Sequence, residues 1–142
     1  MLARNLTTSE RVAAEVVRGT TGALAKEGLL RAGDASSYPR VEVEVLRIDE
    51  APNGIAASAG APLGRGHEVA VIARAVLRTE ASGEGHRDTG DVRGQVFVAR
   101  APTLSRADAE LDAATLAAAR RAGRLLGESL AGHPIATEED SP

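Results

Sequence analysis

The 142-residue chain contains no cysteine, and this absence excludes several kinds of site. Thiol catalysis, thiolate zinc sites, iron–sulfur clusters and disulfide frameworks all require cysteine side chains. A chain of this length can bury roughly 70% of its unfolded surface, so it can be stable without such crosslinks. We therefore expect a single domain over residues 1–136, followed by an acidic, flexible tail over residues 137–142.

Aromatic residues are also scarce, since the chain has one tyrosine (Tyr38), one phenylalanine (Phe97) and no tryptophan. Its formal net charge is −3 at pH 7. Proteins that bind nucleic acid usually combine a basic surface with aromatic side chains that stack on bases. Neither feature is available here, so we expect no nucleic-acid partner.

Long apolar runs are missing as well, because no stretch approaches the roughly 18 consecutive apolar residues that a membrane helix needs. The first residues lack the apolar segment of a secretory signal peptide, since Met1 leads almost directly into the polar run Asn5–Thr8. The sequence therefore predicts neither a membrane span nor a signal peptide within this chain.

Two amphipathic helices are predicted. The first begins near Thr7, where Thr7-x-x-Glu10 has the spacing of a capping box, and Gly28 is a suitable stop. The second runs over residues 105–131, and Gly132 ends it. Within it, two glycines four residues apart, at 123 and 127, predict close packing on the sheet or on the first helix.

Three strands are predicted between the helices. Residues 41–45 alternate valine and glutamate, and the change of phase at Leu46 and Ile48 indicates a β-bulge. The segments 67–79 and 91–100 follow as a hairpin joined by a glycine-rich loop over residues 82–90. The predicted fold class is α+β, a two-layer sandwich. Its sheet is antiparallel or mixed, with three to four strands and two helices on one face, in the order α-β-β-β-α.

Residues able to carry chemistry are few. The three histidines, His67, His86 and His133, do not have the spacing of a metal site. No nucleophile elbow, phosphate-binding loop or dinucleotide fingerprint occurs. We therefore predict no catalytic residue, no metal site and no cofactor, and we expect that the protein is not an enzyme.

The uncovered face of the predicted sheet carries more information. If the alternating valines of residues 67–79 face the helices, the residues between them face outward. The same alternation turns the only phenylalanine outward in the third strand, where we expect it beside Ile72 and Val76. An apolar surface bordered by arginine is either an ordinary solvent-exposed sheet face or a site for another protein or for an amphiphile with anionic headgroups. The candidate partner- or ligand-binding residues are Ile72, Arg74, Val76, Arg78, Arg93 and Phe97.

The chain resembles the LptE family of lipopolysaccharide-assembly lipoproteins. The resemblance lies in the Asn5-x-Thr7 opening before an amphipathic helix, the three strands with a long first connection, and the closing alanine-rich helix, and it covers residues 5–132. It implies a non-enzymatic outer-membrane lipoprotein on the periplasmic face of that membrane. Such a protein plugs and stabilises an LptD-like β-barrel translocon and contacts lipopolysaccharide.

In that family a signal peptide, a lipid-modified cysteine and a first strand precede the Asn-x-Thr motif. The sequence patterns show none of these before Asn5, so the resemblance implies that they lie upstream of Met1. The family's lipopolysaccharide contacts are basic residues on the sheet side, for which Arg74, Arg78 and Arg93 are the candidates here.

Two other functions remain open from the sequence. One is another periplasmic lipoprotein with the same scaffold, such as an activator of a peptidoglycan synthase. The other is a cytosolic α+β binding module, KH-like or ribosome-associated, although the acidic balance and the missing GXXG loop argue against it. The oligomeric state and direct binding of lipopolysaccharide are not determined by these patterns.

Overall fold

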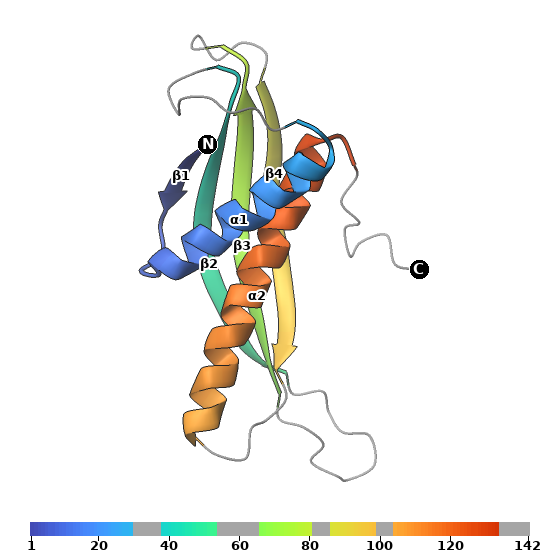
Figure 1. Ribbon diagram of the computed structural model, residues 1–142. Coiled ribbons are helices and arrows are strands. Elements are labelled where there is room, and N and C mark those ends of the chain that lie inside the picture. The colour runs from blue at the N-terminus through green and yellow to red at the C-terminus, as the bar shows by residue number, and fades with distance from the viewer. Residues whose placement is uncertain (30–37, 54–65, 81–85, 99–103, 134–142) are drawn as a thin grey trace.

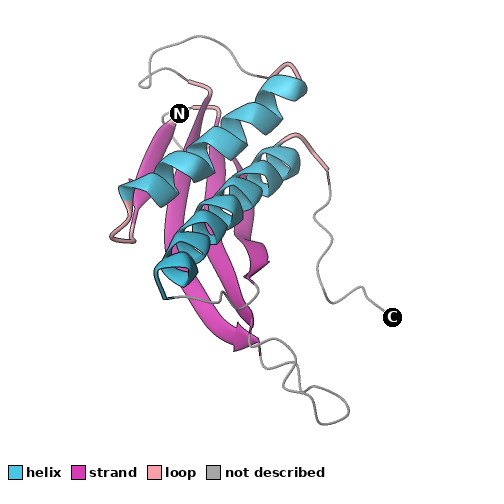
Figure 2. Cartoon of the chain, turned by 60° about the horizontal axis from the view of Figure 1, so that its bottom comes forward, coloured by secondary structure: helices cyan, strands magenta, loops and turns pink. Residues whose placement is uncertain are grey.

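The computed structural model describes residues 1–29, 38–53, 66–80, 86–98 and 104–133. They form two layers, a four-stranded sheet and a pair of helices that both lie on one face of it (Figures 1 and 2). This confirms the predicted α+β sandwich. The predicted tail over residues 137–142 lies outside the described residues.

The sheet has the strand order β1-β2-β3-β4. Its strands are β1 (Leu2–Asn5), β2 (Arg40–Asn53), β3 (Gly66–Arg78) and β4 (His86–Val98). The three long strands pair antiparallel, whereas β1 runs parallel to β2, so the sheet is mixed. The predicted bulge is present in β2 between Val45 and Arg47.

Strand β1 adds an element to the predicted order, which becomes β-α-β-β-β-α. Its four residues pair with residues 42–45 of β2. A four-residue strand is too short to show a periodic pattern, so the sequence patterns missed it. The expectation that this chain has no strand before the Asn-x-Thr motif was wrong, because β1 leads directly into it.

Strand β4 also begins earlier than predicted, at His86 instead of Asp91. Residues 86–90 therefore belong to the strand and not to the hairpin loop. A second bulge interrupts the ladder opposite residues 74–76, where Gly90 has a φ of 68°. The polar and glycine-rich composition of this segment marks a bulge in a strand, which the sequence pattern does not distinguish from a turn.

The helices are α1 (Glu10–Lys26) and α2 (Leu104–Leu130). The N-cap of α1 is Ser9, whose side chain accepts a hydrogen bond from the Val12 N–H. Thr7 was therefore the wrong cap. Its N–H and hydroxyl both donate to the Asn5 side chain, at 3.0 and 2.6 Å, in the turn that connects β1 to α1. Both predicted stops are confirmed, since Gly28 and Gly132 have positive φ angles.

The core lies between the layers and consists of valine, alanine and leucine. The helices approach each other at glycine. A Cβ at Gly123 would lie 2.0 Å from the backbone oxygen of Val16, and one at Gly19 would lie 2.3 Å from the backbone oxygen of Arg120. Of the two packing partners predicted for the glycine pair of α2, the structure selects the first helix.

Candidate interaction surface

The face of the sheet opposite α1 and α2 has no helix over it among the described residues (Figure 2). We call it the open face. Many of the residues on this face are arginine, aspartate or glutamate, so positive and negative side chains lie side by side on neighbouring strands. Six basic and six acidic residues belong to it: Arg4, Arg40, Arg47, Arg74, Arg78, Arg93, Glu42, Glu44, Asp49, Glu68, Asp88 and Asp91.

Three of the six arginines on this face bind carboxylates on neighbouring strands. Arg74 donates two hydrogen bonds to Asp88, with 2.9 Å between Nε and Oδ1. Arg78 Nε donates to Glu42 at 2.7 Å. Arg93 reaches Glu68 at 2.8 Å. These pairs neutralise a surface that the sequence presented as basic.

The ion pairs stabilise the charged forms of their members. The pKa of Glu42 is lowered, chiefly by the hydrogen bond from Arg78 and further by Arg40, although partial burial opposes the change. The pKa of Asp88 is lowered in the same way by Arg74. The pKa values of Arg74 and Arg78 are raised by their carboxylate partners.

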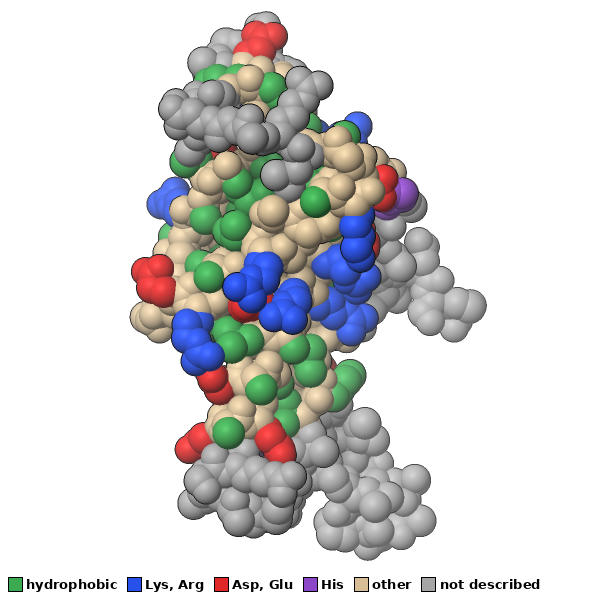
Figure 3. Space-filling view, in the orientation of Figure 1, with side chains coloured by type: hydrophobic (Ala, Val, Ile, Leu, Met, Phe, Trp, Pro, Cys, Tyr) green, Lys and Arg blue, Asp and Glu red, His purple; other side chains and the backbone are tan. Residues whose placement is uncertain are grey.

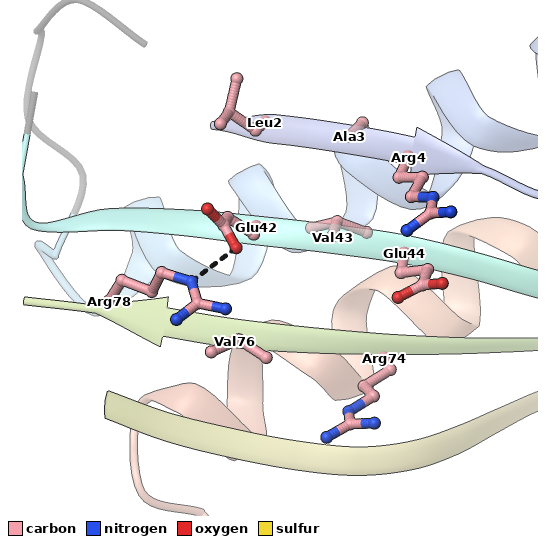
Figure 4. A pocket seen from close by; sticks show the side chains of 9 residues that line it. All are labelled: Leu2, Ala3, Arg4, Glu42, Val43, Glu44, Arg74, Val76 and Arg78. Atoms are coloured by element: carbon pink, nitrogen blue, oxygen red, sulfur yellow. Dashed lines mark hydrogen bonds and ion pairs between the residues drawn. The ribbon is translucent and has the colours of Figure 1, made fainter. Parts of the chain in front are cut away.

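A hollow of about 460 Å³ lies on the open face between β1, β2 and β3 (Figure 4). It is lined by Leu2, Ala3, Arg4, Glu42, Val43, Glu44, Arg74, Val76 and Arg78. Three arginines and two glutamates give this lining one excess positive charge. The side chains of Arg4 and Glu44 have no hydrogen bond or ion pair with any residue that the structure describes, although Glu44 acts electrostatically on Arg74. The guanidinium of Arg4 is therefore available to a ligand.

Three of the six predicted residues, Arg74, Val76 and Arg78, come together in this hollow. The sequence patterns missed the residues on its β1 side, Leu2 and Arg4, because they did not predict that strand. They also missed Glu42 and Glu44, which the valine–glutamate alternation of residues 41–45 does place outward. That alternation was the available signal.

Arg93 lies outside the hollow. It is paired in register with Ile72 and forms ion pairs with Glu68 and, at 3.5 Å, with Asp49. The structure therefore separates Arg93 from the other two predicted arginines.

Ile72 faces away from the core cluster, as predicted, but it is only 3% exposed. Its register neighbours are Arg47 on β2 and Arg93 on β4. The aliphatic parts of long arginine side chains can cover an apolar neighbour while their charged ends stay in water. A partner would reach Ile72 only after these side chains moved.

Phe97 is 60% exposed, the highest value among the exposed large hydrophobic residues that the structure describes. The expectation that it lies beside Ile72 and Val76 was wrong. In the antiparallel hairpin Phe97 pairs with Glu68, eight residues before Val76 on β3, which corresponds to roughly 26 Å along a strand. Phe97 and the hollow therefore mark opposite ends of the open face.

Among the described residues, no three or more histidine, aspartate or glutamate side chains come together as a metal site. Within the same residues no helix has the length and apolar character needed to cross a membrane.

Comparison with known proteins gives one neighbour to report. No family profile and no curated protein matches the chain. A crystal structure described as a "putative lipoprotein from Caulobacter crescentus CB15" has a TM-score of 0.49 and 16% sequence identity, over 91% of this chain and 87% of that one.

Proposed function

We propose that the protein is a non-enzymatic component of outer-membrane lipopolysaccharide assembly that plugs and stabilises a β-barrel translocon and contacts lipopolysaccharide. The observation that carries this proposal is the open face, a sheet surface that no helix of the described residues covers and whose hollow gathers Arg4, Arg74 and Arg78. Strand β1 before the Asn5-x-Thr7 motif supports it further, because the LptE family that the sequence resembles has a strand at that place.

The mixed charge of the open face fits a protein partner. Each arginine–carboxylate pair offers donors and acceptors at fixed positions, and such a pattern selects a partner with complementary groups. Exposed Phe97 supplies an aromatic contact of the kind enriched at protein interfaces. The barrel partner would thus lie against the face from the hollow to Phe97.

The hollow is where the anionic groups of lipopolysaccharide would bind. Arg4 has no carboxylate partner among the described residues, and its guanidinium can take a phosphate directly. Arg74 and Arg78 would add donors that are not used by Asp88 and Glu42. As a lipoprotein in this role, the protein would act at the periplasmic face of the outer membrane.

Binding of purified lipopolysaccharide to single variants tests the hollow. Arg4→Ala and Arg74→Ala are expected to weaken binding about 5- to 10-fold each, because each removes a charge-assisted contact. Arg47→Ala is the matched control, since Arg47 lies on the open face but outside the hollow. Equal affinity of all three variants and the wild type would show that lipopolysaccharide binds elsewhere.

Copurification with the LptD-like barrel protein of the same organism tests the partner. The wild-type chain is expected to form a stable complex that Phe97→Ala weakens. Copurification with a peptidoglycan synthase or with ribosomes, in place of the barrel, would contradict the proposal and favour one of the two other functions.

A further inference from the structure

The helix layer carries a second charged surface, on the side of the molecule away from the open face. Figure 3 shows lysine and arginine side chains gathered over the middle of α1 and α2. Four arginines make up this surface, which we call the arginine patch: Arg18, Arg120, Arg121 and Arg124.

The close helix contact creates the patch. Gly19 lets the backbone of α1 approach the backbone of Arg120 and Arg124, so Arg18, the residue before Gly19, is brought close to the arginines of α2. One carboxylate, Glu15, serves both helices: it lies 2.8 Å from Arg120 Nη2 and 3.2 Å from Arg18 Nη1.

The patch has an excess of positive charge, unlike the neutral open face. Within the described part of the chain, Glu15 and Glu128 are the carboxylates paired with its arginines, so four positive charges meet two negative ones. Glu15 is shielded, with a side chain 13% exposed, whereas the side chains of Arg18 and Arg120 are 71% and 61% exposed. A partner would therefore meet mainly guanidinium groups, although the whole chain has a net charge of −3.

We infer that the arginine patch docks on an acidic protein surface. Arginine forks bind discrete carboxylates in a bidentate geometry, and a protein can place its carboxylates to match each arginine. An anionic lipid surface fits less well, because surfaces that bind membranes usually combine basic residues with apolar side chains that insert. The exposed large hydrophobic residues of the described chain lie outside the patch, which leaves nothing to insert into a membrane interface.

This inference rests on the proposed function, because we assign the acidic surface to the same β-barrel partner. The two faces would then have separate roles. Excess charge on the patch would steer the helix layer toward acidic residues of the barrel, and the neutral open face would make contacts that depend on the pattern of charges and not on their sum.

The test measures the association rate of the purified chain with the detergent-solubilised LptD-like barrel protein at 50 and 300 mM NaCl. The wild type is expected to associate about 10-fold more slowly at the higher salt concentration. The double variant Arg120→Glu/Arg124→Glu is expected to associate at least 10-fold more slowly than wild type at 50 mM NaCl and to lose most of the salt dependence.

A matched control has the same change in total charge. Arg11→Glu/Lys26→Glu replaces two cations of the helix layer outside the patch, and it should associate within about twofold of wild type. Because the reversed charges lie near Glu15, the neutral variant Arg120→Gln/Arg124→Gln is measured as well. It should keep the wild-type melting temperature within a few degrees and still associate several-fold more slowly.

The outcomes separate the two proposals. If the barrel binds the wild type, and Phe97→Ala weakens binding but the patch variants do not, the inference is overturned and the proposed function stands. Equal slowing by the patch variant and its control also overturns the inference, since net charge alone would explain it. If the barrel does not bind the wild type at all, both are overturned.

Discussion

Glu42 joins two arginines of the open face. Its two oxygens bind different arginines, with Oε1 2.9 Å from Arg40 Nη2 and Oε2 2.7 Å from Arg78 Nε. Arg40 precedes it by two residues on β2, and Arg78 lies on β3. The Glu42 carboxylate therefore links β2 to β3 and is part of the lining of the hollow.

The lowered pKa of Glu42 predicts a pH-dependent contribution to stability. A carboxylate with a folded-state pKa below its ordinary value near 4.5 stabilises the fold above that value, and the contribution is lost as the pH falls through the lowered pKa. Glu42→Gln should therefore lower the melting temperature at pH 7 by about 1–3 °C, and the difference should vanish at strongly acidic pH.

Glu44→Gln is the control for this measurement. Glu44 lies two residues further along β2 on the same face, without an ion pair among the described residues. Thermal melts of both variants and the wild type from pH 7 down to pH 2.5 compare them directly. An equal loss for both variants at pH 7, or a loss for Glu42→Gln that persists at pH 2.5, would contradict the assigned ion pair.

At this scale the sequence indicated which side chains point outward but not which of them meet. Alternation along β3 and β4 placed Arg74, Arg78 and Phe97 on the open face. Their neighbours depend on the register between strands, which places Phe97 opposite Glu68 and Arg74 beside Asp88. Register depends on the bulges and on the loop between the strands, and the alternation of one strand does not specify it.

At the scale of elements, the two helices depend on glycine for their separation. Gly123 lies against the backbone of Val16, and a Cβ at Gly127 would lie 2.9 Å from the Thr20 backbone oxygen and 2.5 Å from the Ala23 Cβ. Backbone atoms cannot move aside as the end of a flexible side chain can, so these positions accept no larger residue without a shift of a whole helix.

Two alanine substitutions in the helices should have opposite effects. Gly123→Ala would place a methyl group 2.0 Å from the Val16 oxygen, and we expect it to lower the free energy of unfolding by on the order of 2–3 kcal/mol. Gly22→Ala meets no atom within 4 Å and removes a helix-weakening glycine, so it should raise that free energy by about 0.5–1 kcal/mol.

Urea denaturation of the two variants and the wild type measures both changes. The same sign for the two substitutions would contradict the close helix contact. The sequence predicted close packing for the glycine pair of α2, but it could not select α1 over the sheet, because a small-residue spacing carries no information about the partner.

Strand β1 shows the limit of pattern reading for short elements. It is held by parallel pairing with residues 42–45 and by a hydrogen bond from Leu6 N–H to the Val45 carbonyl oxygen, all contacts to residues about 40 positions later. Such a strand exists because of its neighbour, not because of a local preference. Its absence from the predicted order also concealed Leu2 and Arg4, and with them one side of the hollow.

At the scale of the whole molecule, the two layers present different surfaces. The open face of the sheet is balanced in charge, hollowed between β1 and β3, and carries an aromatic residue near the end of β4. The helix layer presents the arginine patch. Folding alone does not require the hollow of the open face or the arginine patch. A protein held between two surfaces of a partner would use both.

The fold class was predictable at this scale because it follows from two apolar helix stripes and one apolar sheet face that must bury each other. The arrangement of residues on the two outer surfaces was harder to predict from the sequence. The arginines of the patch lie on helices whose sequence resembles any solvent-exposed helix, and only the close contact of α1 and α2 brings them together.

Site-specific photo-crosslinking in living cells tests the central claim most directly. A photoreactive phenylalanine analogue is placed at position 97 and, in a second strain, at position 76. Each analogue crosslinks to a protein adjacent to its end of the open face. We predict that irradiation yields a covalent adduct with the LptD-like outer-membrane barrel protein from both positions. Adducts with a ribosomal protein or a peptidoglycan synthase, or no adduct from either position, would contradict the account.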